Sequence, residues 1–263
     1  MINFQKYVKA ESLEEAYTLN QAKNNRIVAG MLWLRLGTPS YNTAIDISGL
    51  GLDEIEETDE QFRIGAMVSL RTLETNASLN AYTDNAISSA LKDIIGVQFR
   101  NLATIGGSVW GRFGFSDVLT ILLALDSYVE LYKGGTLPMA EFAKQKYDRD
   151  ILTHIIIKKR PCKCVYDSVR IQRTDFPVLT CATSIIDGEY RFAIGARPAR
   201  ARLYGDEKGI LNNGITKEGA AILAKELSTL VPTGSNNRGS AAYRSRLVNV
   251  LVERNLNRLG GLM

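Results

Sequence analysis

Histidine and cysteine are scarce in this sequence of 263 residues, and each shortage argues against a class of chemistry. The only histidine, His154, lies in a strand-like run and is interpreted as a surface strand residue, because a catalytic base would need an orienting partner. The three cysteines are an odd number without a repeated CxxC, so no disulfide framework or iron–sulfur cluster is expected. Cys162 and Cys164 offer two metal ligands, whereas a structural metal site needs about four. No metal site is therefore predicted.

Long apolar runs and strong charge are also missing. No stretch is apolar for long enough to cross a bilayer, and the N-terminal residues lack a signal-peptide core, so we expect a cytoplasmic protein. A formal net charge of +4 is too small to indicate nucleic acid as a partner. No GxGxxG motif joins a strand to a helix, which argues against a Rossmann domain.

The most informative stretch runs from Arg100 to Leu125 and changes from turn chemistry to a helical period. The adjacent glycines Gly106 and Gly107 permit close approach of a ligand, and their amides with the Thr104 and Ser108 hydroxyls could line an anion site. Asp117 would begin the following helix. A plain Gly-Gly turn between buried elements is the alternative.

The rest of the chain alternates between short strand and helix patterns. Ser12 and Glu15 form a capping box for a helix, and Asp187-Gly188 predicts a hairpin turn. The six carboxylates within 53–60 are typical of a solvated turn, and 87–95 has helical spacing. The last helix carries Arg244, Arg246, Arg254 and Arg258, which fits either a docking face or a solvated face. These patterns together predict an α+β fold.

The segment from Arg100 to Tyr132, which contains Thr104-Ile105-Gly106-Gly107 and Ser116-Asp117, resembles a signature of the FAD-binding subunits of molybdenum hydroxylases, the xanthine dehydrogenase and carbon monoxide dehydrogenase family. The resemblance implies that Thr104, Ile105, Gly106, Gly107 and Ser108 lie along the FAD diphosphate and that Asp117 contacts the cofactor. Family members have asparagine where this chain has Ser108.

A second cofactor loop is implied at residues 29–34, where the family has an Ala-Gly-Gly-Thr motif. This chain has Ala29, Gly30, Met31, Leu32, Trp33 and Leu34. Met31 replaces the second glycine and Leu32 replaces the hydroxyl residue, so two outcomes stay open: the backbone amides still bind FAD, or flavin binding has been lost. Trp33 could stack on the cofactor or fill the core.

Further resemblances extend over nearly the whole chain. Leu152 matches a leucine near the flavin ring of the family, and the segments 194–201 and 237–256 match parts of its C-terminal domain. The implied architecture is a FAD-binding domain of the vanillyl-alcohol-oxidase (PCMH) type at residues 1–160, with lobes of about 1–57 and 58–160. A smaller α+β molybdo-flavoprotein domain would follow at 161–263.

The implied function is electron transfer, with no catalytic residue of the chain's own. FAD would take electrons from a two-iron two-sulfur subunit, which receives them from a molybdopterin subunit, and would pass them to NAD or another acceptor. The alternatives are a scaffold subunit that has lost flavin and a stand-alone flavin oxidase. Neither nucleic acid nor a membrane is expected as a partner.

Overall fold

The computed structural model describes residues 1–262, which form two compact units that each draw on several segments of the chain. The first unit comprises Met1–Thr72, Val97–Gly111 and Ser127–Ile157, and the second comprises Leu73–Gly96, Arg112–Asp126 and the chain from Lys158 onward. The contiguous division at residue 160 that the sequence suggests stays a prediction.

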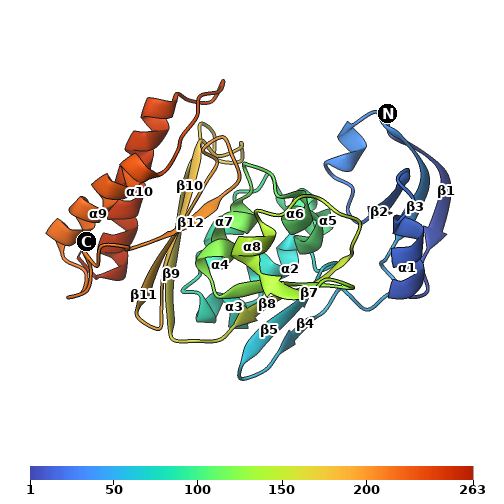
Figure 1. Cartoon of the computed structure of the whole chain (residues 1–263), viewed down its shortest axis with the longest axis horizontal. Coiled ribbons are helices and arrows are strands. Elements are labelled where there is room, and N and C mark those ends of the chain that lie inside the picture. Colours follow the sequence, from blue (N-terminus) through green and yellow to red (C-terminus); the bar gives the residue numbers. More distant parts are fainter. Residues whose placement is uncertain (263) are drawn as a thin grey trace. The chain divides into compact units, whose positions relative to one another are not determined.

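The first unit contains two sheets (Figure 1). A parallel sheet has the order β1-β3-β2, and a larger sheet has the order β4-β5-β8-β6-β7. The strands are β1 (Asn3–Lys9), β2 (Asn25–Val28), β3 (Ser40–Asp46), β4 (Ile55–Glu57), β5 (Gln61–Gly65), β6 (Ser127–Leu131), β7 (Gly135–Pro138) and β8 (Leu152–Lys158). The helices of this unit are α1 (Leu13–Asn20), the 3-10 turn η1 (Leu34–Leu36), α5 (Val97–Leu102), α6 (Ile105–Gly111) and α8 (Met139–Phe142). Helix α2 (Leu70–Thr75) crosses the boundary between the units, and α3 (Ala77–Tyr82), α4 (Ala86–Leu91) and α7 (Asp117–Ala124) belong to the second unit.

Helix α1 packs on the parallel sheet and positions the loop that follows β2. The Ser12 side chain accepts a hydrogen bond from the Glu15 amide at 3.1 Å, which confirms the predicted cap. The Glu15 carboxylate accepts from the Glu11 amide, one residue before the position expected for a capping box. Ala16 and Ile45 are fully buried between helix and sheet.

Two sequence interpretations about the larger sheet need correction. The six acidic residues at 53–60 are exposed, as predicted, but the run is more than a turn, because β4 lies within it and pairs with β5. His154 is buried, at 9% exposed, and it is no surface residue. Its Nδ1 lies 2.9 Å from Nη2 of Arg63, which also donates to Glu130 at 3.1 Å. Neighbouring strands thus bring three ionisable groups together.

The predicted helix at 87–95 is shorter than its apolar spacing indicates. Helix α4 ends at Leu91, and Ile95 has a left-handed backbone with φ of 52°. Ile94 and Ile95 keep the helical spacing of apolar residues but lie after the end of α4. The spacing therefore predicts a longer helix than the structure has.

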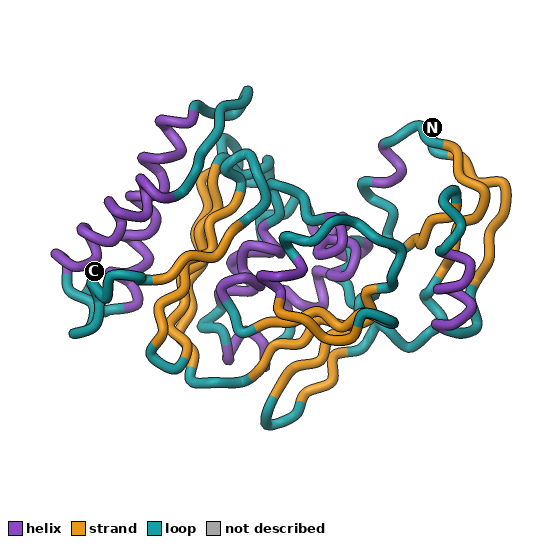
Figure 2. Tube along the Cα trace, in the orientation of Figure 1, coloured by secondary structure: helices purple, strands orange, loops and turns teal. Residues whose placement is uncertain are grey.

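The second unit is a four-stranded antiparallel sheet with helices on both faces. Figures 1 and 2 show α9 and α10 along one face of the sheet, and Figure 1 shows α7 against the other. The sheet order is β12-β11-β10-β9. Its elements are β9 (Cys162–Val169), β10 (Leu179–Ile186), β11 (Glu189–Gly195), β12 (Arg202–Gly205), α9 (Lys217–Leu230) and α10 (Ala241–Leu259). Asp187 and Gly188 both have positive φ, as the predicted hairpin turn between β10 and β11 requires.

Arg244 corrects the interpretation of the last helix. Its side chain is buried, at 1% exposed, and does not belong to a docking or solvated face. The guanidinium instead donates to the carbonyl oxygens of Val178, Gly234 and Gly239, so it ties α10 to neighbouring loops.

Within residues 1–262, none of the helices has both the length and the apolar character that a membrane crossing requires. The same residues contain no group of three or more His, Cys, Asp or Glu side chains placed to hold a metal ion.

Candidate functional site: two loops of the first unit and a pocket of the second

The loop after β2 packs directly against the chain that leads into the Thr-Ile-Gly-Gly segment. A Cβ atom on Gly30 would lie 1.9 Å from the carbonyl oxygen of Leu102 and 3.4 Å from the amide nitrogen of Ala103. Only glycine fits such a backbone contact. The structure therefore brings together the two loops that the sequence implied, Ala29–Leu34 and Thr104–Ser108.

The backbone of Met31 has the conformation that a glycine would adopt. Its φ is 58°, in the left-handed region, where a side chain at Cβ is strained. The Met31 carbonyl accepts from the Arg35 amide at 2.9 Å, which closes the loop into η1. Met31 thus has a backbone conformation that suits the glycine which the resemblance expects at this position.

The first loop also presents backbone donors without protein acceptors. Within the described chain, the amides of Gly30, Met31 and Leu32 donate to no other residue. Leu32 is buried, at 7% exposed, whereas Gly30 and Met31 are half-buried. Three successive amides near the surface are the kind of donor set that binds an anion.

Trp33 lies edge-on to Phe99, with ring centroids 6.0 Å apart. Phe99 belongs to α5, so Trp33 helps to hold the first loop on the helix that precedes the second loop. This contact fits the core-filling alternative for Trp33. Leu34 begins η1 and is half-buried, as is Ala29 at the start of the loop.

The second loop differs from the expected turn. Gly106 and Gly107 lie in the first turn of α6, and the amides of this segment are used within the protein. Ile105 donates to Val68 O at 2.9 Å, Gly106 donates to Ala66 O at 2.8 Å, and Gly107 donates to the Thr104 hydroxyl at 3.2 Å. The free donors of this region are therefore in the first loop, a feature that sequence reasoning missed.

The two glycines of the second loop have different surroundings. A Cβ on Gly106 would lie 2.6 Å from both Cβ and O of Ala66, so this glycine serves close packing. Gly107 is exposed, and a Cβ there would meet only the Thr104 hydroxyl oxygen, at 3.1 Å. The Ser108 hydroxyl donates to Thr104 O at 2.9 Å. Gly107 and Ser108 are the members of this loop that reach the surface.

Leu152 and Asp117, the other two predicted residues, are both buried. Leu152 is the first residue of β8, opposite Leu131, and belongs to the first unit. Asp117 begins α7 as predicted and belongs to the second unit, where Tyr166 and Arg170 donate to its carboxylate. Burial raises the pKa of Asp117, although Arg170 and Tyr166 oppose this effect.

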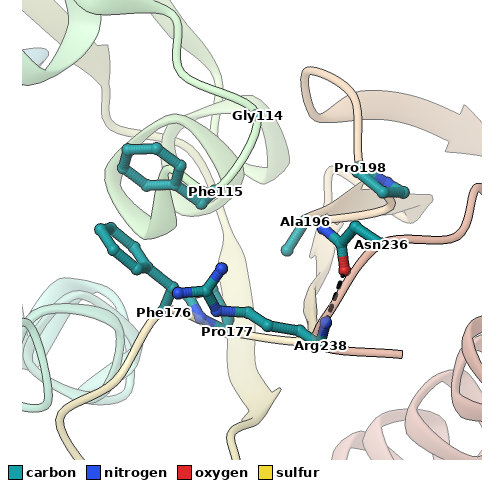
Figure 3. A pocket seen from close by; sticks show the side chains of 8 residues that line it. All are labelled: Gly114, Phe115, Phe176, Pro177, Ala196, Pro198, Asn236 and Arg238. Atoms are coloured by element: carbon teal, nitrogen blue, oxygen red, sulfur yellow. Dashed lines mark hydrogen bonds between the residues drawn. The ribbon is translucent and has the colours of Figure 1, made fainter.

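A pocket of about 290 Å³ lies wholly in the second unit (Figure 3). Phe115 and Phe176 form one wall, with ring centroids 4.4 Å apart, and the Arg238 guanidinium lies 4.9 Å from the Phe176 ring. The remaining lining residues are Gly114, Pro177, Ala196, Pro198 and Asn236. Sequence reasoning missed this pocket, because its lining residues come from four separate loops.

The surroundings of the pocket are positively charged. Arg197 and Arg244 are buried, and in the part of the chain that the structure describes they donate only to carbonyl or amide oxygens. Burial and then the neighbouring Arg238 lower the pKa of Arg244. Arg238, which lines the pocket, is partly compensated by the Asp175 carboxylate 3.6 Å away, whereas the buried Arg197 and Arg244 near the pocket have no carboxylate partner among the described residues. Aromatic faces beside this positive charge favour a planar ligand that carries negative charge.

Comparison with known proteins assigns the chain to a family. Residues 2–159 match the family model described as the FAD binding domain in molybdopterin dehydrogenase. The chain belongs to this family and is a component of molybdenum hydroxylase-like oxidoreductases. The match confirms the predicted family, its fold and FAD as the family's cofactor.

Individual relatives cover almost the whole chain. YgfM of Escherichia coli (strain K12), a protein without a described activity, is 29% identical over 258 residues, which are 94% of this chain and 93% of YgfM. The glyceraldehyde dehydrogenase medium chain of Sulfolobus acidocaldarius is 27% identical and covers 93% of this chain and 94% of its own length. A chain of the carbon monoxide dehydrogenase from Hydrogenophaga pseudoflava has the same fold, with a TM-score of 0.84, 22% identity and 96% of both chains covered.

Proposed function

We propose that this chain binds FAD and transfers electrons within a complex that also has an iron–sulfur subunit and a molybdopterin subunit. The observation that carries the proposal is the contact between the Gly30 loop and the Leu102–Ala103 backbone, beside amides that have no protein acceptor. The matches to the family model and to a medium chain over nearly the full length support the same function.

The residues present fit the cofactor. The amides of Gly30, Met31 and Leu32 would hold the diphosphate, and they compensate for the hydroxyl that Leu32 lacks. Met31 has the left-handed backbone that a glycine adopts easily. Gly107 and Ser108 would contact the cofactor from the second loop, and Leu152 would lie near its ring system. When bound, FAD exchanges one or two electrons with its partners.

This chain's own residues bind and orient the cofactor and tune its surroundings. None of the residues in Ala29–Leu34 and Thr104–Ser108 has a titratable acidic or basic side chain, so no proton transfer is assigned to the two loops. This agrees with a subunit whose redox chemistry belongs to its cofactor.

We propose the pocket of the second unit as the binding site of the electron acceptor, a nicotinamide nucleotide. The Phe115 and Phe176 rings would stack on a planar ring of the acceptor, and Arg238 would face its phosphates. The acceptor pocket is a separate proposal from the FAD loops, and either can fail alone.

Purification and visible spectroscopy test the cofactor proposal. We expect a yellow protein with about one FAD per chain and bleaching of the flavin by NADH. In Gly107→Ala, the added methyl group meets only the Thr104 hydroxyl and suits a helix, so the fold should survive while flavin content falls. A colourless protein that stays colourless after incubation with FAD would instead support the scaffold function.

A further inference from the structure

The guanidinium of Arg244 binds both ends of a tight turn in the second unit. In this turn the Gly239 amide donates to Asn236 O and the Asn236 amide donates to Gly239 O, both at 3.1 Å. Nη2 of Arg244 donates to the side-chain oxygen of Asn236 at 2.6 Å, and Nη1 donates to Gly239 O. The same Asn236 oxygen accepts from the Arg238 amide at 3.0 Å (Figure 3). The turn is therefore held on both sides of Arg238.

The same guanidinium reaches two further segments beside the pocket. Nε donates to Val178 O at 2.9 Å, directly after the lining residues Phe176 and Pro177. Nη1 also donates to Gly234 O at 2.8 Å, and the Gly234 amide donates to Arg197 O, which lies between two lining residues in the chain. One buried side chain thus connects three of the four segments that line the pocket.

The turn places Arg238 where like charge opposes it. Its guanidinium lies 4.9 Å from the centroid of the Phe176 ring and 3.6 Å from the Asp175 carboxylate. Arg244 is 1% exposed and donates only to uncharged oxygens, and its pKa is lowered first by burial and then by Arg238. Since the two guanidinium groups repel each other, the hydrogen bonds of Arg244 must keep the turn in place.

We propose that Arg244 is a positioning residue for this pocket: by binding both ends of the turn 236–239, it keeps Arg238 beside the Phe176 ring, where Arg238 meets the negative charge of a ligand. Arg238 touches the ligand, and Arg244 acts through Arg238. The identification of the ligand as a nicotinamide nucleotide rests on the proposed function, whereas the positioning of the turn does not.

Two variants loosen the turn, and one variant is their control. Arg244→Lys keeps the charge, but a single ammonium group lacks the planar fork that reaches both ends of the turn. In Asn236→Ser, the hydroxyl can still accept from the Arg238 amide but is too short to reach Nη2 of Arg244. Arg246→Lys makes the same exchange two residues further along α10, at an exposed position, and is the matched control.

The readouts are amide hydrogen exchange of residues 236–239 and the kinetics of flavin reduction by NADH. We expect Arg244→Lys to speed exchange in the turn about tenfold and to raise KM for NADH by a similar factor, with little change in kcat. Asn236→Ser should change exchange in the same direction and by less. Arg246→Lys should match the wild type in both readouts.

A double variant separates positioning from a general loss of stability. Arg238→Gln removes the charge that the turn carries into the pocket and should itself raise KM for NADH. If Arg244 acts through Arg238, adding Arg244→Lys to Arg238→Gln should raise KM no further. Independent effects would instead multiply, to about hundredfold if each variant alone raised KM about tenfold, and this would overturn the proposal.

Unchanged exchange of residues 236–239 in Arg244→Lys would also overturn it. If Arg244→Lys does not fold, as circular dichroism would reveal, exchange in Asn236→Ser gives the decision by the same criterion. If wild-type protein is not reduced by NADH, the acceptor proposal fails, and exchange in the turn still decides the role of Arg244.

Discussion

Met31 stands where the family resemblance implies a glycine, and its backbone is left-handed. A methionine with φ of 58° is strained, since left-handed backbone costs a non-glycine residue about 1–2 kcal/mol. The side chain is half-buried, so packing around it compensates only in part for the strain.

Met31→Gly should therefore raise the free energy of unfolding by about 0.5–1 kcal/mol, because relief of strain exceeds the added freedom of the unfolded chain. Urea unfolding of both proteins measures the difference. Ile95→Gly, at φ of 52° in the second unit, is a matched control for strain outside the loops. A less stable Met31→Gly would indicate that the methionine side chain stabilises the loop by packing.

His154 makes the stability of the first unit depend on pH. Burial first, and then the charge of Arg63, lower the pKa of His154 below its ordinary value, while the hydrogen bond from Arg63 lowers the pKa of Glu130. In both cases the unfolded chain binds protons more readily than the folded one as the pH falls. The contribution of His154 to the free energy of unfolding is lost as the pH falls below about 6.5. The contribution of the Glu130 carboxylate is lost as the pH falls below about 4.5.

Acidification from about pH 7 to pH 5 should thus remove the contribution of His154 to the free energy of unfolding, whereas the raised pKa of Asp117 acts in the opposite direction. In His154→Gln, the amide oxygen can still accept from Arg63 but does not titrate. Urea unfolding at several pH values should show that the free energy of unfolding of this variant changes less with pH between about pH 7 and pH 5 than that of the wild type. An equal slope in both proteins would assign the pH dependence to other groups.

At the scale of elements, the sequence predicts some local features: the helix that Ser12 caps, the helix that Asp117 begins and the hairpin at Asp187-Gly188. Asp187-Gly188 and Ser12 carry local signals that tertiary contacts did not override. The ends of α4 and the burial of His154 and Arg244 were not predictable, because each depends on partners distant in sequence.

The candidate site shows the same limit. Motifs located both loops, yet only the structure reveals that Gly106 serves packing on Ala66 and that the unused amides lie at Gly30–Leu32. Every residue except proline has a backbone N–H group, so the residue types do not show which of these groups have a hydrogen-bond acceptor in the folded protein.

The contact between the two loops gives a prediction for Gly30. Gly30→Ala places a methyl group 1.9 Å from Leu102 O, and because backbone atoms cannot yield cheaply, the loops should separate. We expect a loss of about 1–3 kcal/mol in unfolding free energy and of most of the bound FAD. Flavin absorbance and urea unfolding measure the two effects.

Gly49→Ala is the control for this variant, because its added methyl group meets only the flexible end of Lys9, at 2.9 Å. It should retain FAD and stability. Full flavin content in Gly30→Ala would show that the close approach of the loops is not needed for binding.

At the scale of the whole molecule, cofactor binding should stabilise the folded chain by mass action. FAD at about 100 times its dissociation constant should raise the free energy of unfolding by about 2.7 kcal/mol. Thermal unfolding of the flavin-free protein with increasing FAD measures this, and adenosine diphosphate should give a smaller shift through the same amides. A midpoint that is independent of FAD would exclude binding to the folded state.

The division of the chain into alternating segments constrains how the protein is made. The chain passes between the two units five times, and the first unit receives its last segment, Ser127–Ile157, only after two segments of the second unit have been synthesised. During translation neither unit can close early, and the second must wait for α10. A chain released from a stalled ribosome would be unfolded, would expose apolar surface and would contain no folded flavin-binding part. Cellular quality control is therefore expected to remove such a chain whole or not at all.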